Sequence, residues 1–252
     1  MDGFKEAMEY LVNESKPDYL EHEGKTYANK PMFVVHQKEP VADCMQLTTL
    51  TSLIDYIRSN TDKMRKKMLI HVKSPTEVLL FSRLDDNDRT REHLVCVVPD
   101  IPNFEYDKYI SKEAFIIGVE TKFLNDEDSG KETDKSKVIK YAGTVEAGTI
   151  ASYSDDGISQ KATIRDTVTS KADSILPNPV RLCPYRTFHE VEQPVSKFLF
   201  RMKNYEDSAL VALFEADGGA WKNEAMQNVK EYLQKEISQM DAPNDVQFTV
   251  IS

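Results

Sequence analysis

Residues 197–221, near the carboxyl end of the chain, predict the fold class. The second half of this stretch reads Ala209-Leu210-Val211-Ala212-Leu213-Phe214-Glu215-Ala216-Asp217-Gly218-Gly219-Ala220-Trp221. Residues 197–203 and 209–215 are rich in apolar and aromatic side chains and flank a polar turn, so they predict a β-hairpin. The two glycines end the second strand, because glycine adopts turn conformations at no steric cost. A hairpin followed directly by a helix predicts an α+β protein.

A long amphipathic helix is predicted from Ala220 to about Met240. Apolar residues recur there at every fourth position, so one face must be buried; they are Trp221, Ala225, Val229, Leu233 and Ile237. A final strand, 246–251, alternates apolar and polar residues and is expected to join a sheet. We predict an α+β fold with a mixed, largely antiparallel sheet, flanking helices, and the long C-terminal helix packed on a β-hairpin.

The rest of the chain supplies shorter elements. Helical spacing predicts helices over 2–14, 50–60 and 111–123, and β-rich runs predict strands over 32–36, 68–72, 77–84 and 93–98. Hydroxyl side chains at 48–52 and at Ser111 provide N-caps. A helix is also predicted from 137 to about 151, followed by strands at 150–153 and 160–168 around an Asp-Gly turn.

The domain organisation follows from one charged stretch. Residues 125–136 are dense in Asp, Glu, Ser and Lys with one Gly, which is typical of an exposed connection. We expect an N-terminal α/β region, 1–124, an exposed acidic connection, 125–136, and a β-rich C-terminal region, 137–252. One integrated domain with insertions is the alternative.

Composition limits the partners. The formal net charge of −10 disfavours general affinity for nucleic acid or anionic membranes, because that affinity depends on Lys and Arg neutralising phosphates, although local basic patches stay open. The longest apolar runs are about five residues, against the roughly 20 that span a bilayer. The N-terminus lacks the pattern of a signal peptide. We expect a protein of the host cell cytoplasm. The cysteines, an odd number without a C-x-x-C pair, suggest neither disulfides nor a zinc site.

The densest cluster of chemically useful side chains is Pro184-Tyr185-Arg186-Thr187-Phe188-His189-Glu190-Val191-Glu192-Gln193-Pro194. An arginine, aromatic rings and an imidazole between two prolines can hold an anionic or aromatic ligand by bidentate and stacking contacts. The candidate ligand-binding residues are Tyr185, Arg186, Phe188, His189, Arg201 and Trp221. A structural interpretation is equally concrete: Arg186 pairs with Glu190 or Glu192, and Tyr185 and Phe188 fill the core.

A catalytic or metal site has little support. The chain lacks a G-x-S-x-G elbow, a phosphate-binding glycine motif and paired histidine spacings. Weak candidates for metal ligands are the carboxylates of two separate turns: Asp155, Asp156, Glu215 and Asp217. The Gly218-Gly219 turn is more simply a strand-to-helix connection with Asp217 near the cap position, and Arg201 and Glu215 could form a cross-strand pair. No cofactor is predicted.

These residues, in this order, show a resemblance. The runs Leu176–Val180, Pro184–Phe188, Glu192–Pro194, Phe198–Arg201 and Leu213–Trp221 resemble the YfdQ-like family of phage and prophage proteins. The likeness extends from about residue 30 and is strongest from about residue 150. It implies a phage context and brings no established activity.

Three functions compete. The first is a non-enzymatic phage accessory protein, a homo-oligomer that binds or sequesters a host defence factor or a small anionic, nucleotide-like ligand. The second is a structural, self-assembling oligomer or shell protein, for which exposed strand edges are suited. The third is a metal-dependent enzyme acting on nucleotides or nucleic acid through the carboxylates named above.

Overall fold

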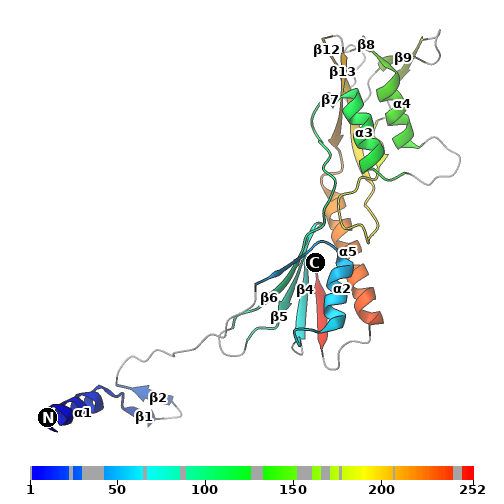
Figure 1. Cartoon of the computed structure of the whole chain (residues 1–252). Helices are drawn as coiled ribbons and strands as arrows, with labels where there is room; N and C mark the ends of the chain where they lie inside the picture. Colours follow the sequence, from blue (N-terminus) through cyan, green and yellow to red (C-terminus); the bar gives the residue numbers. More distant parts are fainter. Residues whose placement is uncertain are drawn as a thin grey trace. The chain divides into compact units, whose positions relative to one another are not determined.

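The computed structural model of the chain describes residues 2–22, 25–29, 43–64, 67–85, 89–125, 133–151, 161–165, 171–175, 178–206, 208–240 and 246–252 (Figure 1). The chain divides into two compact units, Met1–Val41 and Ala42–Ser252. The predicted strand at 32–36, most of the predicted 125–136 connection and the Asp-Gly turn at 154–157 lie outside the described residues. Among the described helices, none is both long and apolar enough to cross a bilayer.

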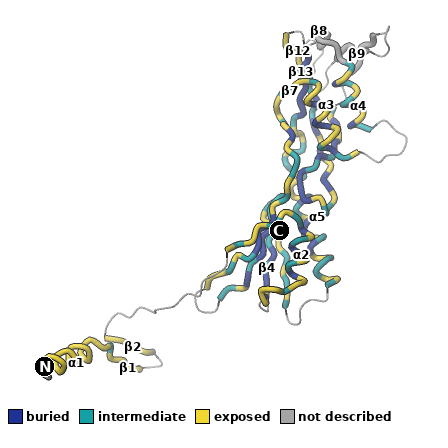
Figure 2. Tube along the Cα trace, viewed as in Figure 1, coloured by how far each residue is buried: buried dark blue, intermediate teal, exposed yellow. Residues whose placement is uncertain are grey.

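The first unit consists of helix α1, Asp2–Ser15, and an antiparallel hairpin of β1, Tyr19–His22, and β2, Lys25–Ala28. The helix confirms the prediction for 2–14. Its apolar side chains are exposed, including Phe4 at 76% and Leu11 at 60% (Figure 2). Tyr19 and Leu20 on β1 are exposed as well. The described side chains of this unit therefore form no hydrophobic core.

The second unit contains a mixed sheet of five strands in the order β14-β4-β5-β6-β3. The strands are β3, Met45–Leu47, β4, Lys67–Ser74, β5, Glu77–Ser82, β6, His93–Val97, and β14, Gln247–Ile251. The three central strands are antiparallel, as the sequence predicts, and the outer strands β14 and β3 pair in parallel with β4 and β6. The C-terminus thus joins a sheet whose central strands lie far away in the sequence.

Two helices, α2, Leu50–Ser59, and α5, Ala220–Gln239, cover one face of the mixed sheet. Thr49 caps α2 by accepting a hydrogen bond from the Ser52 N–H, and Asn60 ends it in the left-handed conformation. The α5 helix packs on β4 and β14. Aliphatic side chains dominate the shared core, which we call the aliphatic core; its members include Leu53, Ile57, Ile70, Val78, Leu80, Val95, Val229 and Leu233.

An antiparallel sheet of four strands runs in the order β11-β12-β13-β7. It consists of β7, Ile110–Ser111, β11, Val180–Leu182, β12, Ser196–Tyr205, and β13, Ser208–Glu215. The predicted hairpin at 197–215 is confirmed as β12 and β13. Helices α3, Lys112–Lys122, and α4, Asp134–Thr144, pack beside it, and Ser111 caps α3 as predicted.

The core beneath α3 and α4 is aromatic. It contains Phe104, Phe115, Phe123, Phe198 and Phe200, and we call it the aromatic core. The Phe104 ring packs so tightly on Gly118 that a Cβ there would lie 2.9 Å from a ring carbon. Glycine at this helical position therefore allows the close approach of the ring.

The predicted helix at 137–151 is wrong in its second half. The α4 helix ends at Thr144, and β8, Val145–Ala151, follows and pairs with β9, Lys161–Arg165. β-Branched residues at 145, 149 and 150 and Gly148 disfavour helix there, which explains the change. A third strand that the sequence pattern did not predict, β10, Lys171–Ile175, pairs with β9.

Candidate functional site: the segment between two cores

The segment 183–196, called here the connecting segment, carries most of the predicted ligand-binding residues and links the two cores. At its start, the Cys183 carbonyl accepts a hydrogen bond from Leu124 N–H (2.8 Å), and Tyr185 N–H donates to the Lys122 carbonyl (3.0 Å). These bonds attach the segment to the end of α3. Farther along, the side chain of Phe188 is fully buried in the aliphatic core. The segment therefore spans from one core to the other.

Gln193 holds the segment in its bent path. Its side-chain oxygen accepts hydrogen bonds from the N–H groups of Arg186 (2.9 Å) and Thr187 (3.2 Å). Its side-chain NH₂ donates to the carbonyls of Phe188 (2.8 Å) and Val191 (3.2 Å). Only 4% of Gln193 is exposed, so it provides partners for backbone groups that water cannot reach.

Arg186 lies at the centre of the site and is only 7% exposed. Its Nη1 donates to Glu215 Oε1 at 2.6 Å, and its Nη2 donates to the Ser196 hydroxyl. Burial lowers the pKa of Arg186 from the ordinary arginine value, and nearby charges, that of Glu215 among them, offset part of this effect. An arginine keeps its charge under such conditions, because its reference pKa is so high.

Aromatic rings surround the guanidinium. Its central carbon lies 4.1 Å from the centroid of the Trp221 ring, 5.5 Å from that of Phe198 and 5.7 Å from that of Tyr106. These distances fit cation–π attraction, which is strongest with tryptophan. Because Phe198 belongs to the aromatic core and Trp221 lies in the first turn of α5, the guanidinium connects the four-stranded antiparallel sheet with the helix that packs on the mixed sheet.

The turn after β13 is organised by Asp217. Its carboxylate accepts a hydrogen bond from the Gly219 N–H at 2.9 Å and is bonded to the Ser196 hydroxyl. Burial alone would raise the pKa of Asp217, but these hydrogen bonds and the charge of Arg186 together lower it below the usual value. The cap residue of α5 is Gly219, with φ of 80°, and Asp217 lies two residues before it, near the cap position as predicted. A left-handed residue is required there, which favours glycine.

A separate cleft lies at the N-terminus of α2. It has a volume of about 400 Å³ and is lined by Thr48, Thr49, Thr51, Pro99, Asp100, His189 and Glu190. The His189 ring packs against that of Tyr185, with centroids 5.1 Å apart. The Glu190 carboxylate accepts a hydrogen bond from the Thr51 N–H at 3.2 Å, so an internal anion already occupies the helix N-terminus.

The structure thus separates the predicted ligand-binding residues. It brings Arg186 and Trp221 together, and Tyr185 and His189 together, while Phe188 has no exposed surface. The predicted Arg201–Glu215 pair is wrong, because Arg201 lies opposite Ala212, and Phe198 lies opposite Glu215. The strands pair with a register that differs by three residues from the one such a pair needs.

The partner proposed for Arg186 is also wrong, since the guanidinium bonds to Glu215 and not to Glu190 or Glu192. Of the four carboxylates considered as metal ligands, Asp155 and Asp156 lie outside the described residues. Glu215 and Asp217 are engaged by Arg186, Ser196 and Gly219. The described part of the chain contains no group of three or more His, Cys, Asp or Glu side chains arranged to hold a metal ion.

Sequence reasoning missed Ser196, Gln193 and Tyr106 as members of this network. Gln193 stands just before Pro194, and Ser196 begins β12, so neither position has a pattern of its own. Comparison of the chain with protein-family models, with curated proteins and with solved structures found no match. The resemblance to the YfdQ-like family stays a prediction from the residues.

Proposed function

We propose that the protein is a non-enzymatic phage accessory protein that acts by protein–protein binding as a homo-oligomer, and that α1 mediates its self-association. The phage setting is what the YfdQ-like resemblance implies. The observation that supports binding through α1 is the exposure of its apolar side chains within its own unit, with Phe4 at 76%, Met8 at 47% and Leu11 at 60%.

The marginal stability of the helix and hairpin in the first unit favours binding to a partner. Isolated helices shorter than about 12–15 residues are marginal in water, and α1 has 14 residues. A two-stranded hairpin is also marginal by itself. Since the described side chains of this unit bury no core, packing against another surface would supply the missing apolar burial.

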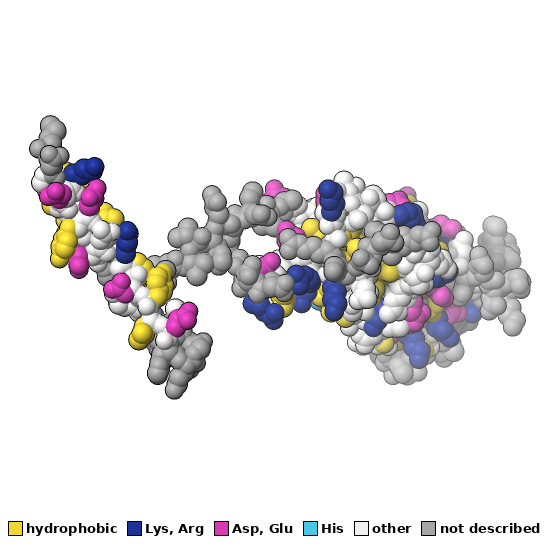
Figure 3. Space-filling view, turned by 90° about the horizontal axis from the view of Figure 1, so that it is seen from below, with side chains coloured by type: hydrophobic (Ala, Val, Ile, Leu, Met, Phe, Trp, Pro, Cys, Tyr) yellow, Lys and Arg dark blue, Asp and Glu magenta, His cyan; other side chains and the backbone are white. Residues whose placement is uncertain are grey.

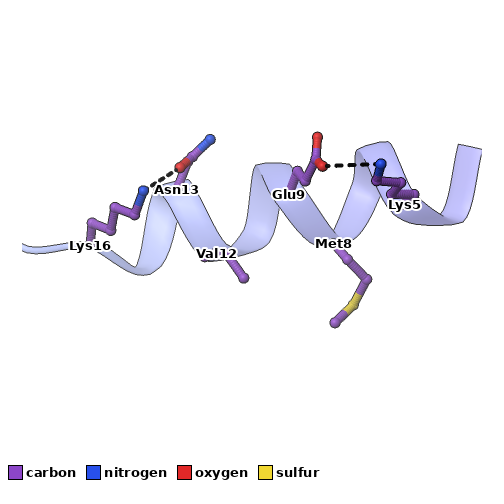
Figure 4. A pocket seen from close by; sticks show the side chains of 6 residues that line it. All are labelled: Lys5, Met8, Glu9, Val12, Asn13 and Lys16. Atoms are coloured by element: carbon purple, nitrogen blue, oxygen red, sulfur yellow. Dashed lines mark hydrogen bonds and ion pairs between the residues drawn. The ribbon is translucent and has the colours of Figure 1, made fainter.

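The side chains of α1 also suit pairing with a second copy. Figure 4 shows Met8 and Val12 on one side of the helix, away from Lys5, Glu9, Asn13 and Lys16. At 3.6 residues per turn, Lys5, Glu9 and Lys16 lie along one edge of the apolar stripe, and Glu14 lies at the other. In a parallel pair of identical helices, the edge that carries Lys5 and Lys16 on each helix faces the edge that carries Glu14 on its partner.

Binding of a small anionic ligand has less support than self-association. The Arg186 guanidinium is buried beneath Trp221 and bonded to Glu215, so its charge is already compensated inside the protein. The cleft beside His189 contains the carboxylates of Asp100 and Glu190, which repel anions. A metal-dependent enzyme is likewise less favoured, because Glu215 and Asp217 already have partners.

Light scattering coupled to gel filtration tests the proposal on the full chain. At micromolar concentration, the wild type is expected to elute as a dimer or larger oligomer, and a Phe4→Ser/Leu11→Ser variant as a monomer. Tyr10→Ser is the matched control. It removes an equally exposed ring, at 65%, from a part of α1 outside the apolar stripe, and should leave the mass unchanged.

The urea midpoint of the second unit should be the same in all three proteins, because none of these positions lies in its cores. A monomeric wild type would contradict the proposal. So would an unchanged oligomer in the Phe4→Ser/Leu11→Ser variant, or equal dissociation in Tyr10→Ser.

A further inference from the structure

The mixed sheet ends on one side at strand β14. Strand β4 pairs with one side of β14, and none of the strands that the structure describes pairs with the other side. Figure 1 shows β14, coloured red, beside β4. Alternate residues of an edge strand direct their N–H and C=O groups away from the sheet, so β14 offers a row of backbone hydrogen-bonding groups to another strand.

This edge lacks the features that usually prevent edge pairing. Such features are a very short strand, charged side chains, proline or a β-bulge. Among the described edge strands, only β3, β7 and β14 contain no charged residue, and β14 is the longest of the three, with five residues. Its register with β4 is regular throughout. Charged side chains of both signs are spread over the face of the second unit that Figure 3 shows, so the uncharged edge differs from that surface.

The sequence of β14 is complementary to itself in an antiparallel pair. With a two-fold axis at Thr249, Phe248 lies opposite Val250 of the second copy. Gln247 lies opposite Ile251 in the same way, and no like charges meet. Opposed residues of antiparallel strands share a face, so Phe248 and Val250 of both copies stay on the face that packs against the aliphatic core. Both side chains are half-buried in one copy, and pairing would cover them further.

The helix above this edge also fits the pairing. Helix α5 packs on both β4 and β14. Neighbouring strands lie about 4.8 Å apart, so the α5 helix of a second copy would lie two strand spacings away, at about 10 Å. Packed helices are separated by about 8–10 Å. The two α5 helices would therefore pack side by side over the joined strands, without a clash and without a gap.

We infer that β14 is a contact between two copies of this chain, in which the two β14 strands pair antiparallel about a two-fold axis at Thr249 and join two mixed sheets into one. The contact lies in the second unit and does not rest on the self-association proposed for α1. Two interfaces with separate two-fold axes build assemblies larger than a dimer. A pair of five-residue strands belongs at the weak end of protein interfaces, so we expect it to form above the micromolar range used to test α1.

Sedimentation equilibrium of the Phe4→Ser/Leu11→Ser variant isolates this contact, because the variant lacks the apolar stripe of α1. We expect a monomer at micromolar concentration and a reversible dimer as the concentration rises to about 500 µM, where a weak contact is populated. An oligomer held by α1 would instead be present at micromolar concentration and would not respond to substitution of Thr249. The two proposals can therefore fail separately.

Substitutions at the axis test the pairing itself. On this background, Thr249→Lys and Thr249→Glu should each raise the dissociation constant about fivefold, the upper end of the effect of one cross-strand pair, because like charges then face each other. An equimolar mixture of the two variants should recover the dimer, since Lys and Glu then lie opposite each other. Thr249 is exposed, so the urea midpoint of the second unit should not change.

Gln46→Lys is the matched control. Gln46 is exposed on β3, the edge strand at the opposite side of the same sheet, and its substitution should leave the dimer unchanged. A background variant that stays monomeric at the highest concentration would overturn the inference. Equal dissociation in Gln46→Lys would overturn it too, because another surface would then hold the copies together. A mixture of the Thr249→Lys and Thr249→Glu variants that stays monomeric would rule out the two-fold axis at Thr249.

Discussion

The mixed sheet and the four-stranded antiparallel sheet of the second unit each carry two helices, yet their cores differ. The core of the mixed sheet consists mainly of Leu, Ile and Val, whereas the core of the antiparallel sheet adds five phenylalanines, in edge and tilted contacts, to its Val, Leu, Ala and Met side chains. The aliphatic core contains Phe188, which comes from the connecting segment and not from its own helices or strands. The aliphatic core therefore depends on a residue from the segment that leaves the aromatic core.

The two sheets also differ in how far apart their paired strands lie along the sequence. Strands β12 and β13 form a hairpin, so the antiparallel sheet has a local pairing at its centre. In the mixed sheet, β14 at the C-terminus pairs with β4, which begins at Lys67. Loop closure makes such distant pairing slow. Because β14 follows every strand of the antiparallel sheet in the sequence, the mixed sheet can be completed only after those strands have been translated.

The strongest test of this dependence is Phe188→Ala. Truncating a fully buried phenylalanine costs about 3–5 kcal/mol in unfolding free energy, through lost burial and the cavity left behind. Because the same segment is anchored to the aromatic core, we expect both sheets to unfold in one transition at a lower urea concentration. Circular dichroism and Trp221 fluorescence, measured in parallel, would report it. Two separated transitions, with only one of them shifted, would show that the cores are independent.

Arg186→Met tests the second connection between the sheets. The substitution keeps an unbranched side chain but leaves Glu215 and Ser196 without their buried partner. Breaking a buried ion pair costs about 3–5 kcal/mol, and we expect about 3 here, because the Glu215 side chain is 31% exposed and water screens its charge.

Urea unfolding of Arg186→Met, of Glu215→Gln and of the double variant measures the coupling between the two side chains. The losses should be less than additive, and the emission of Trp221, the single tryptophan, should change when its stacked guanidinium is removed. Additive losses would mean that the 2.6 Å contact contributes little to folding.

The elements that the sequence predicted well are those with local signals. The α5 stripe, the β12–β13 hairpin and the Thr49 and Ser111 caps follow from spacing and side-chain chemistry within a few residues. The parallel pairing of β14 with β4 has no local signal, because nothing in an alternating strand identifies its neighbour.

The candidate site shows the same division between features with a local sequence signal and features that depend on tertiary packing. A rigid segment rich in Arg and aromatic residues was recognisable from its prolines, and the structure has it as a well-bonded connection. The partner of Arg186 was not recognisable, because Glu215 lies 29 residues away and is brought close by the strand register. By sequence distance alone, Glu190 and Glu192 are nearer candidates for the partner of Arg186 than Glu215 is. Pairing of buried charges depends on tertiary packing, which single-sequence periodicity does not contain.

Substitution of Asp217 has the smallest expected effect on stability. It tests whether the turn before α5 contributes to the contacts around Arg186. Its pKa is lower in the folded protein than the value of about 3.9 of an unfolded chain, because Ser196, Gly219 and Arg186 favour the carboxylate despite its partial burial. The stabilisation is therefore complete above the unfolded pKa and is lost as the pH falls through the lower, folded one. Urea midpoints measured from pH 6 down to pH 3 should decrease less for Asp217→Asn than for the wild type. Since Arg186 keeps its charge over this range, parallel curves would show that the carboxylate contributes nothing to holding Trp221 and the start of α5 against the two sheets.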